Sequence, residues 1–118
     1  MYHYKAKLVR VIDGDTIDVD IDLGFDVWLK RQRIRLAGID APESRTRNKA
    51  EKVLGLAAKT RLTELCSEEM QLESLGTGKY GRILGIPKTS DGTSMCQILI
   101  DEGHAVEYTG GKKTKVWA

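Results

Sequence analysis

The chain has 118 residues, of which 41% are hydrophobic and 31% are charged, and it carries a formal net charge of +2. This length and composition fit one globular domain with its own core, and they argue against disorder and against folding that depends on disulfides or a structural metal. No run of residues approaches the roughly 20 apolar positions of a membrane span, and the first residues lack the plan of a signal peptide, so we expect a cytoplasmic protein with no membrane partner.

Three strands are expected in the first part of the chain. Residues 4–12 form the first. In the second, residues 15–23, apolar residues alternate with aspartates, which is typical of a strand with one buried face. After a turn around Gly24, the third strand covers residues 27–39 and places an arginine at every second position. The alternating aspartates are Asp18, Asp20 and Asp22, and the arginines are Arg31, Arg33 and Arg35.

The second part of the chain is expected to contain two helices and two strands. A stripe of apolar residues at helical spacing runs through residues 43–66. Strands at 69–75 and 82–87 flank a glycine-rich turn. Ser94 is a suitable cap for a short helix, although residues 98–100 are equally compatible with a strand. The stripe of the long helix consists of Leu54, Ala58, Leu62 and Leu65.

This order of elements predicts an α+β, mainly β fold, a five-stranded Greek-key barrel of the OB type with helices packed beside it. We expect residues 1–107 to form a single domain. Residues 108–118 carry three lysines and no acid, and are expected to form a mobile basic tail. Cys66 and Cys96 lie far apart in the sequence, which favours free thiols over a zinc site or a disulfide framework.

Charge is segregated along the chain. Residues 13–26 hold six aspartates and no lysine or arginine, whereas residues 30–61 hold ten lysines or arginines against three acids. A basic segment beside an acidic cluster suits a polyanion that is bound near a metal ion. Two solvated surfaces of opposite sign explain the same pattern, and charge alone favours that simpler explanation.

Asp15 is the first candidate for a chemical role. It follows an Asp-Gly turn, and by parity it lies on the inward side of its strand together with Ile17. A carboxylate that points inward needs a partner, and a cation is one such partner. The alternative is that Asp15 accepts backbone hydrogen bonds within the turn.

Asp40 and Glu43 form the second candidate, at the point where the third strand is expected to end and the long helix to begin. Carboxylates three residues apart at a helix start lie close together, with Arg35 further up the strand. Hard cations such as calcium bind carboxylate and carbonyl oxygens. The same Asp-x-x-Glu pattern with Pro42 is also a capping box, so the residues alone leave both interpretations open.

The third candidate is the segment Lys79-Tyr80-Gly81-Arg82. Arg82 begins a strand directly after a glycine turn, from which its guanidinium can project across a cleft. Guanidinium groups bind phosphates through two parallel hydrogen bonds. The alternative is an ordinary surface arginine.

Taken together, these three segments resemble the staphylococcal (micrococcal) nuclease family, in family order and at near-family spacing over residues 9–107. The resemblance implies an OB-type barrel and metal-dependent hydrolysis of phosphodiester bonds in DNA and RNA. It also implies one calcium ion or another divalent cation as cofactor, and products with 3′-phosphate ends.

The resemblance further implies roles for individual residues. By motif, the metal ligands are Asp15, Asp40 and the backbone carbonyl of Ala41, the phosphate-binding arginines are Arg35 and Arg82, and the residue that orients or deprotonates water is Glu43. Lys79 and Tyr80 resemble residues that flank the nucleotide. Lys49 and Lys52 belong to the basic segment, which we expect to bind the nucleic-acid backbone with little sequence preference.

The chain also departs from the family pattern. The hairpin between Asp15 and Arg35 is several residues longer, and the family's final helix is missing after residue 107. We expect a monomer, with a dimer as the alternative because a partner subunit would supply the missing packing. A non-catalytic OB-type module that binds single-stranded nucleic acid is the competing class, but it should lack the acids and arginines of the site. A compact nuclease of this kind would suit a phage or a mobile element.

Overall fold

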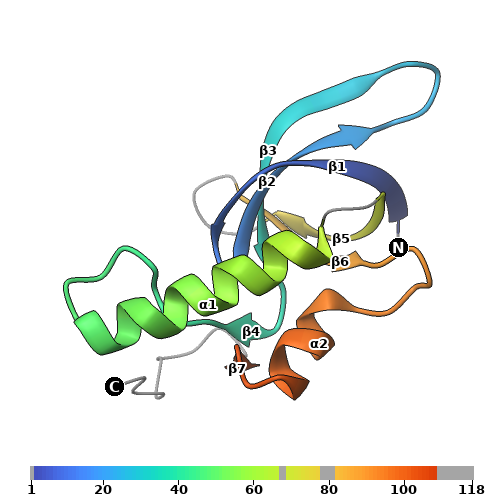
Figure 1. Cartoon of the computed structure of the whole chain (residues 1–118). Helices are drawn as coiled ribbons and strands as arrows, with labels where there is room; N and C mark the ends of the chain where they lie inside the picture. Colours follow the sequence, from blue (N-terminus) through green and yellow to red (C-terminus); the bar gives the residue numbers. More distant parts are fainter. Residues whose placement is uncertain (1, 67–68, 78–81, 109–118) are drawn as a thin grey trace.

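The computed structural model describes residues 2–66, 69–77 and 82–108 of the chain. Within these residues, five strands close into a barrel with the order β1-β2-β3-β6-β5, and Figure 1 shows two helices beside it. β3 and β6 pair in parallel and the other neighbours pair antiparallel, so the barrel is mixed. The strands are β1 (Tyr2–Asp13), β2 (Thr16–Asp22), β3 (Trp28–Leu36), β5 (Met70–Thr77) and β6 (Ile83–Lys88). The predicted mainly β barrel is confirmed.

Alternation along the strands fills the barrel. Ile17 and Val19 of β2 and Ile34 of β3 are completely buried, and Leu36 is 1% exposed. Burial of one such side chain stabilises the fold by about 1.5–3 kcal/mol. The apolar face predicted for residues 15–23 is therefore the face that forms the core.

Both cysteines are free, as predicted, and both are buried. Burial raises the pKa of the Cys66 thiol to about 12 and that of the Cys96 thiol to about 11. Because a thiol reacts as its thiolate, neither cysteine is a nucleophile at neutral pH. They act as small apolar side chains between the helices and the barrel.

The long helix begins later than predicted. α1 spans Lys49–Leu65, and its N-cap is Asn48, whose side chain accepts hydrogen bonds from the backbone of Ala50 and Glu51. The predicted start near Pro42, with Asp40 and Glu43 as a capping box, is wrong. The N–H groups of residues 43 and 44 donate to distant side chains, so the chain from 41 to 48 runs as a loop.

The apolar stripe of α1 also differs from the prediction. Gly55, Ala58 and Leu62 are the buried residues of the helix, whereas Leu54 is 42% exposed. Gly55 therefore takes the inward position that the predicted stripe gave to Leu54. No helix in the described ranges is long and apolar enough to cross a membrane.

The second helix and a short sheet complete the fold. α2 (Met95–Asp101) begins at the predicted cap Ser94, which accepts from the backbone of Gln97, so the helix and not the strand is confirmed. The predicted third strand ends at Leu36, because Gly38 turns the chain at a φ of +78°. Beyond it, β4 (Ile39–Asp40) pairs with β7 (Val106–Glu107), which the sequence did not predict. The predicted basic tail lies outside the described residues, apart from Tyr108.

The β2–β3 hairpin extends well beyond the barrel (Figure 1). Its tip is closed by backbone hydrogen bonds from Leu23 N to Val27 O at 2.8 Å and from Val27 N to Gly24 O at 3.0 Å. Gly24, Phe25 and Asp26 all have positive φ. The predicted turn around Gly24 is confirmed, and β1 pairs with the outer edge of β2 as far as Asp22, next to this turn.

Candidate active site

Asp15 lies at the turn between β1 and β2, and it points inward as predicted, with 8% of its surface exposed. Its Oδ1 accepts from the Thr16 hydroxyl at 3.0 Å, and its Oδ2 accepts from the Ala41 backbone N–H at 3.1 Å. The second bond spans 26 residues of sequence. The Asp15 carboxylate therefore joins the turn to the loop after β4, rather than only bracing its own turn.

Arg35 brings the two buried acids of the site together. Its Nη1 donates to the Leu36 carbonyl at 2.9 Å and its Nη2 to the Ile39 carbonyl at 2.8 Å. From this fixed position Nη2 lies 3.6 Å from Asp15 Oδ2 and 4.0 Å from Asp40 Oδ1. Only 14% of the Arg35 side chain is exposed, so these charges interact with little screening by water.

Asp40 owes its position to the small β4–β7 sheet. It pairs with Val106 and is 4% exposed. The next residue, Ala41, donates its N–H to Asp15, so the Asp40 carboxylate and the Ala41 backbone lie beside the Asp15 carboxylate. The short β7 was missed because two residues carry no periodic signal.

Asp13 and Ser44 were also missed by the sequence analysis, and they anchor the loop that carries Glu43. Ser44 donates to Asp13 Oδ1 from its backbone N–H at 3.1 Å and from its hydroxyl. The Glu43 N–H donates to Glu51 Oε2 of α1 at 3.0 Å, while the Glu43 side chain is exposed. Glu43 thus lies at the rim, three residues beyond Asp40, on a loop tied to both β1 and α1.

Gly55 allows α1 to pack directly on this loop. A Cβ at position 55 would lie 2.4 Å from the Glu43 carbonyl oxygen and 2.6 Å from the Ser44 nitrogen. Real side chains do not tolerate such distances to backbone atoms, so the loop or the helix must shift. The glycine that weakens the helical pattern is required by the approach of helix to loop.

We therefore expect Gly55→Ala to destabilise the protein by about 1–3 kcal/mol, as overpacking does, although alanine favours helices by about 1 kcal/mol over glycine. Urea unfolding followed by circular dichroism measures this change. Ala57→Gly, at an exposed position of the same helix, is the control and should lose about 1 kcal/mol through propensity alone. A stabilised Gly55→Ala variant would contradict the close packing.

The remaining predicted residues lie around this group. Arg82 is half-buried and directly precedes β6. Ile83 of β6 pairs with Ile34 of the parallel strand β3 and Leu84 pairs with Arg35, so the Arg82 backbone lies two residues before the position opposite Arg35. Lys49 and Lys52 are exposed on the first turns of α1, after the loop that carries Glu43. Lys79 and Tyr80 lie outside the described residues.

The donor set suits a hard dication. Asp15 and Asp40 supply two buried carboxylates in one place, and the Ala41 backbone lies next to them. Calcium and magnesium prefer such oxygen ligands and fill the rest of their coordination shell with water or substrate oxygens. In the described part of the chain no three His, Cys, Asp or Glu side chains form a metal-binding group. The site would therefore bind a dication with few charged side chains, and water or substrate oxygens would supply the other ligands.

The protein is thus a small mixed barrel with two buried carboxylates and an arginine near the ends of its strands. Asp15, Asp40 and Arg35 are here called the acid–arginine site. Residues 33–116 match the family described as staphylococcal nuclease homologue, and the chain belongs to this family. This confirms the resemblance found in the sequence.

Curated relatives agree with this assignment. The chain is 35% identical to a micrococcal nuclease of Shigella flexneri, over 89% of this chain and 59% of the relative. It is 34% identical to an uncharacterized endonuclease of Escherichia coli, over 87% of this chain and 60% of the relative. The chain thus spans about three fifths of the length of these relatives.

Proposed function

We propose that the protein is a calcium-dependent endonuclease that hydrolyses DNA, and RNA as a second substrate, with little sequence specificity and with 3′-phosphate products. The observation that carries this proposal is the convergence of Asp15 and Asp40 on the Arg35 guanidinium. Membership of the nuclease family supports the nucleic-acid substrate.

In this mechanism, Asp15, Asp40 and the Ala41 carbonyl would hold a calcium ion, which would supply Lewis-acid stabilisation of the phosphate. Attack of water on phosphorus builds negative charge on the equatorial oxygens. Arg35 and Arg82 donate hydrogen bonds to these oxygens, and they stabilise the transition state more than the ground state if the second contact forms as charge develops.

Glu43 orients the attacking water and accepts its proton, since an exposed carboxylate at the rim of the site can reach a water on the open side of the phosphate. The water oxygen forms a new bond to phosphorus, and the bond from phosphorus to O5′ breaks. The leaving oxygen takes up a proton and becomes a 5′-hydroxyl, and the phosphate stays on the 3′ carbon. Lys79 and Tyr80 are proposed to flank the nucleotide.

The decisive experiment is cleavage of end-labelled single-stranded DNA and RNA by the purified chain with calcium, followed by addition of a chelator. Cleavage that stops with the chelator supports the proposal, and Asp40→Asn is the matched inactive control. Tight binding of single-stranded DNA without cleavage under any divalent cation would instead favour the non-catalytic binding module.

Lys49 and Lys52 are expected to bind the substrate backbone. Lys49→Ala/Lys52→Ala should weaken DNA binding and lower the slope of log affinity against log salt by roughly 0.7 per lost phosphate contact on a single strand. The rate at saturating substrate should remain near normal, because these exposed lysines lie outside the acid–arginine group.

Titration at several salt concentrations measures this effect. The control is Lys49→Arg/Lys52→Arg, which keeps both charges and should keep the slope. If the alanine variant lost its maximal rate at unchanged affinity, the two lysines would belong to the chemistry instead.

A further inference from the structure

The outward face of the β1–β2–β3 sheet has a regular charge pattern that the proposed site does not use. β2 is the middle strand, and the ladder places Arg10 of β1 and Arg33 of β3 on either side of Asp18. Two residues further along, Lys7 of β1 lies opposite Asp20, and Lys30 Nζ lies 3.4 Å from Asp20 Oδ2. Each of these acids is therefore flanked by cations from both neighbouring strands.

The cations of this face are much more exposed to solvent than the acids. The Arg10 and Arg33 side chains are 59% and 45% exposed, whereas that of Asp18, to which both donate from Nε, is 10% exposed. The Lys30 side chain is 69% exposed and that of Asp20 is 22%. Two cations per acid leave a net positive surface, and the acids beneath hold the cations in place.

Hydrogen bonding keeps both acids ionised. The bond from Arg33 lowers the pKa of Asp18, and the backbone N–H of Arg31 does the same for the pKa of Asp20. The aspartate pattern of residues 15–23 thus has a structural explanation. Asp18 and Asp20 form a negative row along β2. It is partly covered by a more exposed positive row of four side chains from β1 and β3, namely Arg10, Arg33, Lys7 and Lys30.

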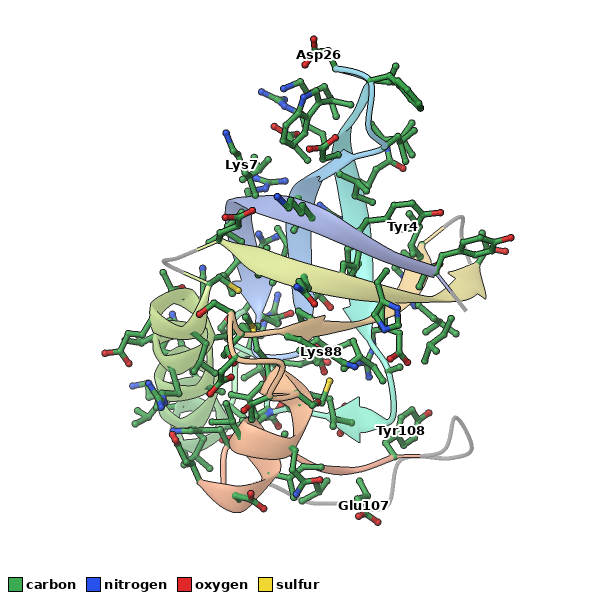
Figure 2. All side chains as sticks on the ribbon, turned by 90° about the vertical axis from the view of Figure 1, so that its right-hand side faces the viewer. Tyr4, Lys7, Asp26, Lys88, Glu107 and Tyr108 are labelled. Carbon is green, nitrogen blue, oxygen red and sulfur yellow. The ribbon has the colours of Figure 1, made fainter. Side chains whose placement is uncertain are left out.

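Trp28 gathers two lysines at one point of this face. The ammonium of Lys7 lies 5.3 Å from the centre of the Trp28 ring, and that of Lys30 lies 5.4 Å from it. Cations at this distance are attracted by the ring. The attraction holds charges from two different strands close together, at the foot of the projecting hairpin, where Figure 2 shows Lys7.

The positive row is continuous with the acid–arginine site. Arg33 and Arg35 are two residues apart on β3, about 6.6 Å along the strand, and they lie opposite Asp18 and Thr16 of β2. Lys30 lies further along β3, beyond an irregularity at Arg31, which has a φ of +52°, and this irregularity brings Lys30 to the side of the sheet that carries Asp20. A chain of phosphates held at Arg35 can therefore continue along Arg33 to Lys30 and Lys7.

We propose that Arg10, Arg33, Lys7 and Lys30, here called the hairpin face, form a second binding surface for the phosphate backbone of the nucleic-acid strand that leaves the active site. The identity of the ligand rests on the proposed nuclease function. Purely structural ion pairs are the alternative, but they do not require cations that outnumber the acids and stay exposed above them.

The test is binding of fluorescent single-stranded DNA of 4 and 16 nucleotides in the presence of a chelator, where nothing is cleaved. For the longer strand, Lys7→Gln/Lys30→Gln should lower the slope of log affinity against log salt by roughly 0.7 per lost phosphate contact. The affinity gained between 1 M and 0.1 M salt should therefore be smaller than that of the unmodified chain by roughly fivefold per lost contact. Binding of the shorter strand should change far less. Both lysines are exposed, and thermal unfolding should confirm that the variant folds normally.

Lys88→Gln is the matched control. Lys88 lies on β6, bound to Glu73 at 3.0 Å, and Figure 2 shows it on the other side of the β1 and β5 ribbons from Lys7. If Lys7→Gln/Lys30→Gln had the same affinity for the longer strand as Lys88→Gln, the proposal that the hairpin face binds nucleic acid would be wrong. This would hold even if the chain cleaved DNA. If the double variant lost binding as expected and the chain cleaved nothing, the hairpin face would stand and the nuclease proposal would fail.

Discussion

Asp15→Asn and Asp40→Asn should each reduce calcium affinity and nuclease activity together, by at least the 10–100-fold that loss of even an outer partner of a metal ligand costs. The physical reason is that Asp15 and Asp40 are the two buried carboxylates beside Arg35, and Arg35 already offsets part of their charge. After removal of one carboxylate charge, the charges of the remaining aspartate and of Arg35 cancel. The site then no longer attracts a dication.

Asp15→Asn should also cost stability. Both oxygens of Asp15 accept hydrogen bonds, from the Thr16 hydroxyl and from the Ala41 N–H. An amide can keep its oxygen toward the Ala41 N–H and turn its NH2 toward the Thr16 hydroxyl, but it loses the charge that strengthens both bonds and attracts Arg35. The loss of a charge-assisted bond of this kind is worth about 1.5–3 kcal/mol.

Calorimetric titration with calcium, alongside kcat/KM on one oligonucleotide, measures both effects. Asp26→Asn is the matched control, since Asp26 lies at the hairpin tip with a φ of +62°, a conformation that asparagine tolerates. Unchanged calcium affinity in both site variants would show that Asp15 and Asp40 are structural partners of Arg35 and not metal ligands.

The barrel could be predicted because the alternation of polar and apolar residues along its strands indicates which side of each strand is buried. The alternation in residues 15–23 fixes which side of β2 is buried, and the same parity correctly places Asp15 inward. Arg33 and Arg35 of β3 pair with Asp18 and Thr16 on the face opposite the core, whereas Arg31 lies at an irregularity of the strand with a φ of +52°. Local periodicity was sufficient for these residues because each strand of the barrel has one buried side.

The environment of the acids could not be predicted in the same way. The helix start was misplaced because Asp40-x-x-Glu43 has the pattern of a capping box, whereas the actual cap is Asn48. What overrides the local pattern is a set of contacts between residues distant in sequence, from Ser44 to Asp13 and from Ala41 to Asp15. β4 and β7 belong to the same group of long-range contacts, and no window of the sequence contains both partners.

Arg82→Lys should lower the maximal rate by roughly 10²–10³, with a much smaller effect on substrate binding. A guanidinium spans two phosphate oxygens in one plane, whereas an ammonium offers a single point of charge on a flexible stem. If the second contact forms mainly in the transition state, its loss appears in kcat and not in affinity. Arg82 directly precedes β6, the strand that pairs with β3 and so with the strand of Arg35, and this placement is compatible with both arginines binding one phosphate.

Arg35→Lys should be at least as damaging, for an additional reason. Its Nη1 and Nη2 already donate to the Leu36 and Ile39 carbonyls while Nη2 faces the two carboxylates. A single ammonium cannot reach these acceptors from one position, so Arg35→Lys should lose stability and substrate affinity as well as rate. Arg45→Lys, at an exposed position of the loop before α1, keeps charge and side-chain type in the same way and should leave all three quantities nearly unchanged.

Steady-state kinetics on a short oligonucleotide, with binding measured separately in chelator, separate the two arginines. We expect Arg82→Lys to move kcat alone, and Arg35→Lys to move kcat, affinity and the midpoint of thermal unfolding together. A near-normal kcat for Arg82→Lys would mean that Arg82 is an ordinary surface arginine. In that case Arg35, whose Nη2 lies 3.6 Å from Asp15 Oδ2 and 4.0 Å from Asp40 Oδ1, would have to stabilise the developing charge without a second guanidinium.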